Sequence, residues 1–157
     1  DIAKPAVQLA AKKHPNITWL VASGALLPVA DGTMDVVSSL FSPIPVAEMA
    51  RVLKPQGYVL VVRAADTHLY HLRQALFGEV HAHQPDKFLE ELATHFELVQ
   101  QHELRFDLHL PQQALKNLLA MTPYVWKAKP EHRLALEQNL TFNTQAAFSL
   151  MLLRKRL

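Results

Sequence analysis

The sequence predicts an α/β fold built on a mostly parallel sheet with an antiparallel edge, and three observations support this. Strand-like and helix-like segments alternate through the first two-thirds of the chain. The early strand-like segments are apolar on both faces, which is typical of parallel strands covered by helices on both sides. Two strand-like segments near the end flank helical ones, which indicates an antiparallel addition. The 157 residues suit one domain.

Each expected element has a local signal. Pro5 suits the first turn of a helix, and His14-Pro15 ends that helix. Asp31-Gly32 suits a turn before the next strand. The expected helices cover residues 6–13, 45–53, 86–95, 112–120 and 131–140. The expected strands cover residues 17–22, 34–41, 58–62, 96–108 and 146–154. The first three of these strands should form the parallel part of the sheet.

The composition excludes several classes of function. No run of apolar residues is long enough for a membrane helix, and the first residues do not resemble a signal peptide. The absence of cysteine excludes disulfides, thiolate zinc sites and cysteine nucleophiles in this chain and is consistent with a cytoplasmic protein. The four glycines are isolated from one another, so the chain contains no glycine-rich phosphate or dinucleotide loop.

A helix, a Lys-Pro-x-Gly turn and an apolar strand follow one another over residues 50–62. This run resembles the stretch before the fifth strand of the class I S-adenosylmethionine-dependent methyltransferases, which have a Rossmann-like sheet. Gln56 stands where that family usually has the first glycine of Pro-Gly-Gly. Residues 27–31 and 34–37 resemble the same family's passage into its fourth strand.

Three further motifs narrow the resemblance. His68-Leu69, residues 79–83 and residues 121–128 occur in the order found in the large-subunit ribosomal RNA guanine-N1 methyltransferases. The resemblance implies S-adenosylmethionine as cofactor, ribosomal RNA as partner, and methyl transfer to guanine N1 by in-line displacement at the sulfonium carbon. The four-cysteine zinc module, the first strand and the glycine-rich loop of that family have no counterpart here.

These gaps imply that residues 1–157 are the C-terminal portion of a single methyltransferase domain. Because the glycine-rich loop accommodates part of the cofactor, we expect this chain alone to be inactive. Without the central strand the sheet has unpaired edges, so a homodimer is one predicted state.

The resemblance assigns three cofactor contacts. Asp1 falls where the family has an acidic residue that accepts the ribose hydroxyls, and Ser23 ends the next strand, where the adenine is contacted. His68 follows the fifth strand, at the crevice where open α/β sheets bind ligands. The alternatives are an ordinary charged terminus, a plain loop serine and a solvent-facing histidine at the start of a helix.

Glu79 and His81 are the expected catalytic residues. Methylation at guanine N1 requires loss of the N1 proton, and a carboxylate or imidazole can take it. The alternative is an ordinary polar loop. A metal site at these histidines is disfavoured, because nine histidines in one chain give ligand-like spacings by chance.

Residues 121–128 offer the aromatic faces of Tyr124 and Trp126 to an unstacked base, although core packing of at least one is expected. Nearby lysines and the basic residues 154–156 suit RNA phosphates or plain solvation. Two other functions compete with RNA methylation: a small-molecule methyltransferase of the same fold, and a non-catalytic RNA-binding or dimerisation module.

Overall fold

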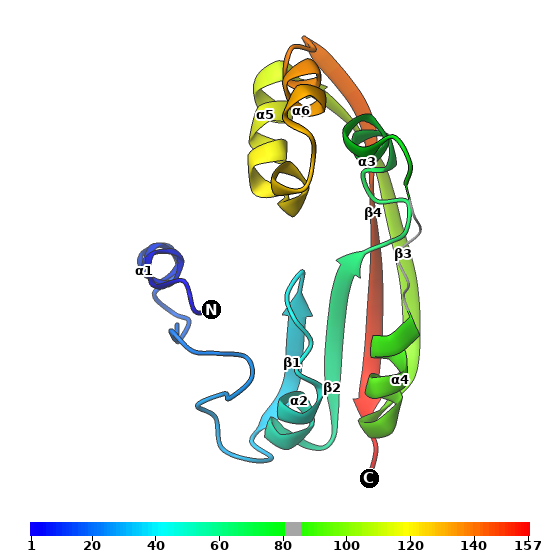
Figure 1. Cartoon of the computed structure of the whole chain (residues 1–157). Helices are drawn as coiled ribbons and strands as arrows, with labels where there is room; N and C mark the ends of the chain where they lie inside the picture. The colour runs from blue at the N-terminus through cyan, green and yellow to red at the C-terminus, as the bar shows by residue number, and fades with distance from the viewer. Residues whose placement is uncertain (81–85) are drawn as a thin grey trace. The chain divides into compact units, whose positions relative to one another are not determined.

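The computed structural model describes residues 1–80 and 86–157 (Figure 1). The helices are α1 (Lys4–Lys13), α2 (Val46–Val52), α3 (Tyr70–Phe77), α4 (Asp86–His95), α5 (Gln112–Met121), α6 (Pro130–Glu137) and the short 3-10 helix η1 (Pro123–Trp126). The strands are β1 (Met34–Leu40), β2 (Leu53–Ala64), β3 (Phe96–Pro111) and β4 (Thr141–Lys155). Within the described part of the chain, every helix is too short or too polar to span a membrane.

The four strands form one mixed sheet in the order β1-β2-β4-β3. Strands β1 and β2 are joined through α2 and point the same way, as the arrows in Figure 1 show. Strands β3 and β4 form an antiparallel hairpin, because Gln112 pairs with Leu140 at one end and His95 with Arg156 at the other. The α/β class, the parallel pair and the antiparallel edge are therefore confirmed, and β1 and β3 are the edges of the sheet.

The strand expected over residues 17–22 is wrong. That segment has no regular ladder. The Ile17 amide donates to the His14 oxygen in a local turn, and Asp1 accepts a hydrogen bond from Ala22 and donates one to Leu20. A strand needs a run of paired residues, and the described residues offer no neighbouring strand for this segment. Its apolar side chains are consequently exposed, with Ile17 at 54% and Val21 at 53%.

Strand β2 begins at Leu53, earlier than the sequence pattern indicates. Residues 54–57 were expected to form a turn, but they run beside β1, with Lys54 Nζ 2.7 Å from Asp35 Oδ1. Gln56 takes a left-handed φ of 60°, a local irregularity within the strand. The other expected strands and helices are present, with β3 and β4 longer than predicted, while α3 is an additional helix.

One compact unit comprises Asp1–Val61, α4, the start of β3 and the last residues, Met151–Leu157. Its core forms because α2 presents Val46, Met49 and Ala50 on one face, the spacing of an amphipathic helix. These side chains pack with apolar residues of β2, α4 and β4 and with the fully buried Phe96 at the start of β3. The core fixes α2 and β2, which in turn hold the loop that precedes β1.

The other unit comprises residues 62–80 and Gln101–Leu150. Its core is made of leucines from α3, α5 and α6, among them Leu72, Leu115 and Leu136. Leu108, Leu110 and Phe142 of the β3–β4 hairpin pack against this cluster. Because side chains alternate along a strand, the intervening hairpin residues lie on the opposite face of the sheet.

Candidate functional site

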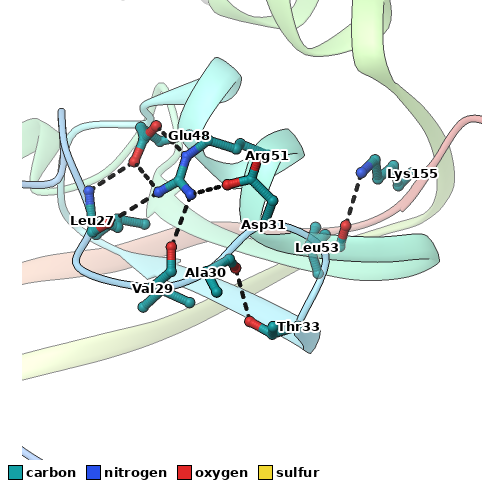
Figure 2. Close-up of polar contacts among 9 residues, drawn as sticks. All are labelled: Leu27, Val29, Ala30, Asp31, Thr33, Glu48, Arg51, Leu53 and Lys155. Atoms are coloured by element: carbon teal, nitrogen blue, oxygen red, sulfur yellow. Dashed lines mark hydrogen bonds and ion pairs between the residues drawn. The ribbon is translucent and has the colours of Figure 1, made fainter.

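A polar cluster around Arg51 fixes the loop that leads into β1 (Figure 2). The Arg51 guanidinium donates to the backbone oxygens of Val29 at 2.8 Å and Leu27 at 3.0 Å, and to the carboxylates of Glu48 and Asp31. Glu48 also accepts a 2.7 Å hydrogen bond from the Leu27 amide. The Arg51 hydrogen bond is the main cause that lowers the pKa of Glu48 to about 2. The same ion pair raises the pKa of Arg51.

The structure brings Asp1 and Ser23 together. The backbone oxygen of Asp1 accepts a 3.1 Å hydrogen bond from Ala22, the residue before Ser23. Asp1 Oδ1 accepts from the amide of Ala3 at 2.8 Å, and Ser23 Oγ accepts from the amide of Ala25 at 3.2 Å. Both side chains are exposed. A carboxylate and a hydroxyl are therefore exposed at adjacent turns, each held by a backbone amide two residues further along the chain.

His68 lies just beyond the end of β2 and is half-buried. Its Nδ1 accepts a 3.1 Å hydrogen bond from the amide of Ala147 on β4, and its ring centroid lies 4.9 Å from the ring centroid of Phe148. Ala65 continues the ladder by donating to the Ala147 oxygen at 2.9 Å. The imidazole thus replaces the backbone acceptor that β2 no longer supplies. Nδ1 must be unprotonated to accept this bond.

Glu79 and His81, the expected catalytic pair, are not brought together by any described contact. Glu79 is exposed in a bend after α3, whereas His81 lies outside the described residues. Within residues 1–80 and 86–157, no three metal-ligating side chains gather closely enough to hold a metal ion.

A pocket of about 520 Å³ lies beyond the carboxyl end of β2. Neither His68 nor Glu79 lines it. Its walls come from the β2–α3 connection, the start of α3 and one face of the β3–β4 hairpin, and include Thr67, Tyr70, Asp107, His109, Asn143 and Gln145. The sequence analysis missed all of these residues. The only signal for them is the alternation of polar residues in both strands of the hairpin.

The aromatic residues near α5 divide into two roles. Tyr124 packs against the leucine core, and its ring centroid lies 6.1 Å from that of Phe77 in an edge-to-face arrangement. The expected core packing of one aromatic residue is thus confirmed. Trp126 is 85% exposed, next to the exposed Lys127.

The three basic residues near the C-terminus, residues 154–156, all donate hydrogen bonds to other parts of the chain. Arg154 Nε donates to Glu97 at 2.6 Å, an ion pair that raises the pKa of Arg154. Lys155 Nζ donates to the backbone oxygen of Leu53 at 2.8 Å (Figure 2). Arg156 donates to backbone oxygens at the end of α4, where the helix dipole favours a cation.

Comparison with known proteins identifies relatives of the chain. Residues 1–61 match the family described as "Methyltransferase domain". The chain is 38% identical over 133 residues to the 23S rRNA (guanine(748)-N(1))-methyltransferase of Streptomyces fradiae, covering 83% of the chain and 48% of that protein. The chain thus spans about half the length of the curated relatives that it matches.

Solved structures show the same fold at low sequence identity. The YcgJ protein of Bacillus subtilis matches with a TM-score of 0.64 and 18% identity, covering 100% of this chain and 81% of that one. A SAM-dependent methyltransferase of Methanosarcina mazei matches with a TM-score of 0.60 and 16% identity, covering 100% and 80%. Residues 1–61 therefore match the methyltransferase domain family, and the mixed sheet has the same fold as these solved structures.

Proposed function

We propose that this chain is the C-terminal portion of a single methyltransferase domain, and that the complete protein methylates N1 of a guanine in large-subunit ribosomal RNA. The observation that carries this proposal is the 38% identity, over 83% of the chain, to a protein named for that reaction. A cytoplasmic location is part of the proposal, because ribosomal RNA is the substrate.

The residues present fit the adenosine part of S-adenosylmethionine. Asp1 Oδ2 accepts no hydrogen bond from the described residues, so it is available to a ribose hydroxyl, and Ser23 presents an exposed hydroxyl beside it. The donors for the methionine part belong to the glycine-rich loop, which this sequence does not contain. When bound, the cofactor supplies a methyl group on a sulfonium, which is already a good leaving group. We propose His68 as a further contact to it.

The proposed bases for the guanine N1 proton are Glu79 and His81. Glu79 is exposed, so a base in RNA can approach its carboxylate. The exposed ring of Trp126, with Lys127 beside it, suits stacking of an unpaired base and contact with its phosphate.

The test is transfer of a tritiated methyl group to a ribosomal RNA hairpin. The protein that carries its upstream sequence should label the RNA and stop reverse transcription at one guanine, since N1 methylation blocks base pairing. The 157-residue chain alone should label it orders of magnitude more slowly, because small errors in reacting geometry cost large factors in rate.

Comparable labelling by both proteins would place the cofactor site elsewhere. Labelling of small metabolites without labelling of RNA would favour the small-molecule alternative. RNA binding without methyl transfer by the extended protein would favour the non-catalytic one.

A further inference from the structure

The pocket beyond β2 lies where a ligand site is expected in this kind of sheet, yet neither His68 nor Glu79 lines it. In open α/β sheets, ligands bind outside the carboxyl ends of the parallel strands. Thr67 follows the end of β2 by three residues, and Tyr70 begins α3. The volume of about 520 Å³ lies in the usual range for small-molecule pockets.

The hairpin side of the pocket presents prearranged polar groups. Gln145 Nε2 donates to Asp107 Oδ1 at 3.1 Å, which holds the carboxylate in place. The second oxygen of Asp107 accepts no hydrogen bond from the described residues. His109 Nδ1 lies 2.9 Å from Asn143 Oδ1, where the ring nitrogen donates because an amide oxygen can only accept.

Two residues that line the pocket have buried hydroxyls without a partner among the described residues. The side chain of one of them, Thr144, alternates with Asn143 and Gln145 and lies on the face of the hairpin that meets the leucine core. Thr144 is 4% exposed, and its Oγ1 makes no hydrogen bond with the described residues. The hydroxyl of Thr67, also buried, is equally unpartnered. An unsatisfied buried hydroxyl destabilises a fold, and such groups are commonly found where a polar ligand or ordered water completes the bonding.

The chemistry of the walls selects the kind of ligand. Among the described residues that line the pocket there is no lysine or arginine, and Asp107 is one of them, so a phosphate is disfavoured. A carboxylate suits the paired N1 and N2 hydrogens of guanine, and the amides of Asn143 and Gln145 suit its O6. Tyr70 adds an aromatic ring that is 42% exposed, on which a base can stack.

We propose that this pocket receives the unstacked guanine of the RNA substrate, with Asp107 accepting from its N2 amino group. The proposal rests on the proposed function and specifies the base-binding part of the same site. Tyr70 stacks on the base, while Gln145 positions the carboxylate.

The test replaces Asp107 by Asn in the upstream-extended protein. Glu103→Gln is the matched control, because it makes the same carboxylate-to-amide change on the same strand and sheet face, outside the pocket. Two hairpins are compared: one with the acceptor guanine, and one with inosine there, which lacks the N2 amino group. Calorimetry measures S-adenosylmethionine affinity, and separately the binding of guanosine monophosphate.

Asp107→Asn should lower kcat/KM on the guanine hairpin about 10- to 100-fold, the effect of one lost hydrogen bond to a charged group. On the inosine hairpin the loss should be less than about threefold, while Glu103→Gln and the cofactor affinity stay at the wild-type level. Asp107→Asn should also weaken guanosine monophosphate binding. Equal losses on both hairpins, or wild-type kinetics and nucleotide binding, would overturn the pocket assignment. Nucleotide binding that depends on Asp107 without any RNA methylation would instead overturn the proposed function.

Discussion

Replacing His68 by Ala separates the two roles that this residue can have. The substitution removes the acceptor of the Ala147 amide, and Ala147 is 0% exposed, so water cannot replace it. Leaving a buried donor unsatisfied costs about 1–3 kcal/mol of unfolding free energy. The loss of the ring contact with Phe148 adds to this cost. For a chain of this size, each kcal/mol lowers Tm by about 2–4 °C.

Urea denaturation measures the structural part, and calorimetric titration of the upstream-extended protein with S-adenosylmethionine measures the cofactor part. We expect His68→Ala to weaken cofactor binding by about 1–2 kcal/mol, the value of one lost hydrogen bond. His68→Asn is the control, because its side-chain oxygen can still accept from Ala147. It should recover stability without recovering affinity. Wild-type stability in His68→Ala would refute the structural role, and wild-type affinity in both variants would remove His68 from the cofactor site.

Three further predictions concern stability and association. In Gly57→Ala the new Cβ would lie 3.0 and 3.1 Å from two backbone oxygens, so we expect a loss of about 1–3 kcal/mol by urea denaturation. Gly24→Ala, whose nearest neighbour lies at 3.6 Å, should change stability by less than about 0.5 kcal/mol, and equal losses would contradict the steric reasoning. Because the pKa of Glu48 falls from 4.5 to about 2 on folding, its stabilising effect is complete above pH 4.5 and is lost as the pH falls toward 2. Glu48→Gln should therefore flatten the acid limb of a stability–pH curve, and an unchanged limb would rule Glu48 out as its source. Val36 is exposed on the edge strand β1, so Val36→Lys should shift the 157-residue chain from self-associated to monomeric in sedimentation velocity, unless association uses another surface.

The sequence predicted elements that are determined locally and missed those that depend on partners. Helix α4 lies where its apolar spacing indicates, because a helix satisfies its own backbone hydrogen bonds. Residues 17–22 have an equally apolar pattern, but a strand needs a neighbouring strand, and among the described residues this segment bonds only to His14 and Asp1 through its backbone. The start of β2 was misplaced because residues 54–57 pair with β1 despite their turn-like sequence, with the left-handed Gln56 as a local irregularity in the strand.

The pocket illustrates the same limit for function. Asp107 and Gln145 are 38 residues apart in sequence, and only the register of the β3–β4 hairpin brings them within 3.1 Å. His68 was recognised because it belongs to a short motif close to a strand end. Short family motifs thus point to candidate residues near strand ends, whereas a cluster such as Asp107 and Gln145 is spread over two strands and becomes visible only in three dimensions.

The segment between β3 and β4 begins and ends at the same place in the fold. Gln112 donates through its amide to Leu140 and through its side chain to Glu137, both at 2.9 Å, so residues 112–140 leave and re-enter the hairpin at one place. When the ends of a loop are held together, each doubling of its length raises the entropic cost of closing it by only about 0.6 kcal/mol. This helical excursion can therefore be exchanged or lengthened during evolution while the hairpin register is preserved. It is therefore a suitable place to insert a different segment into an unchanged scaffold.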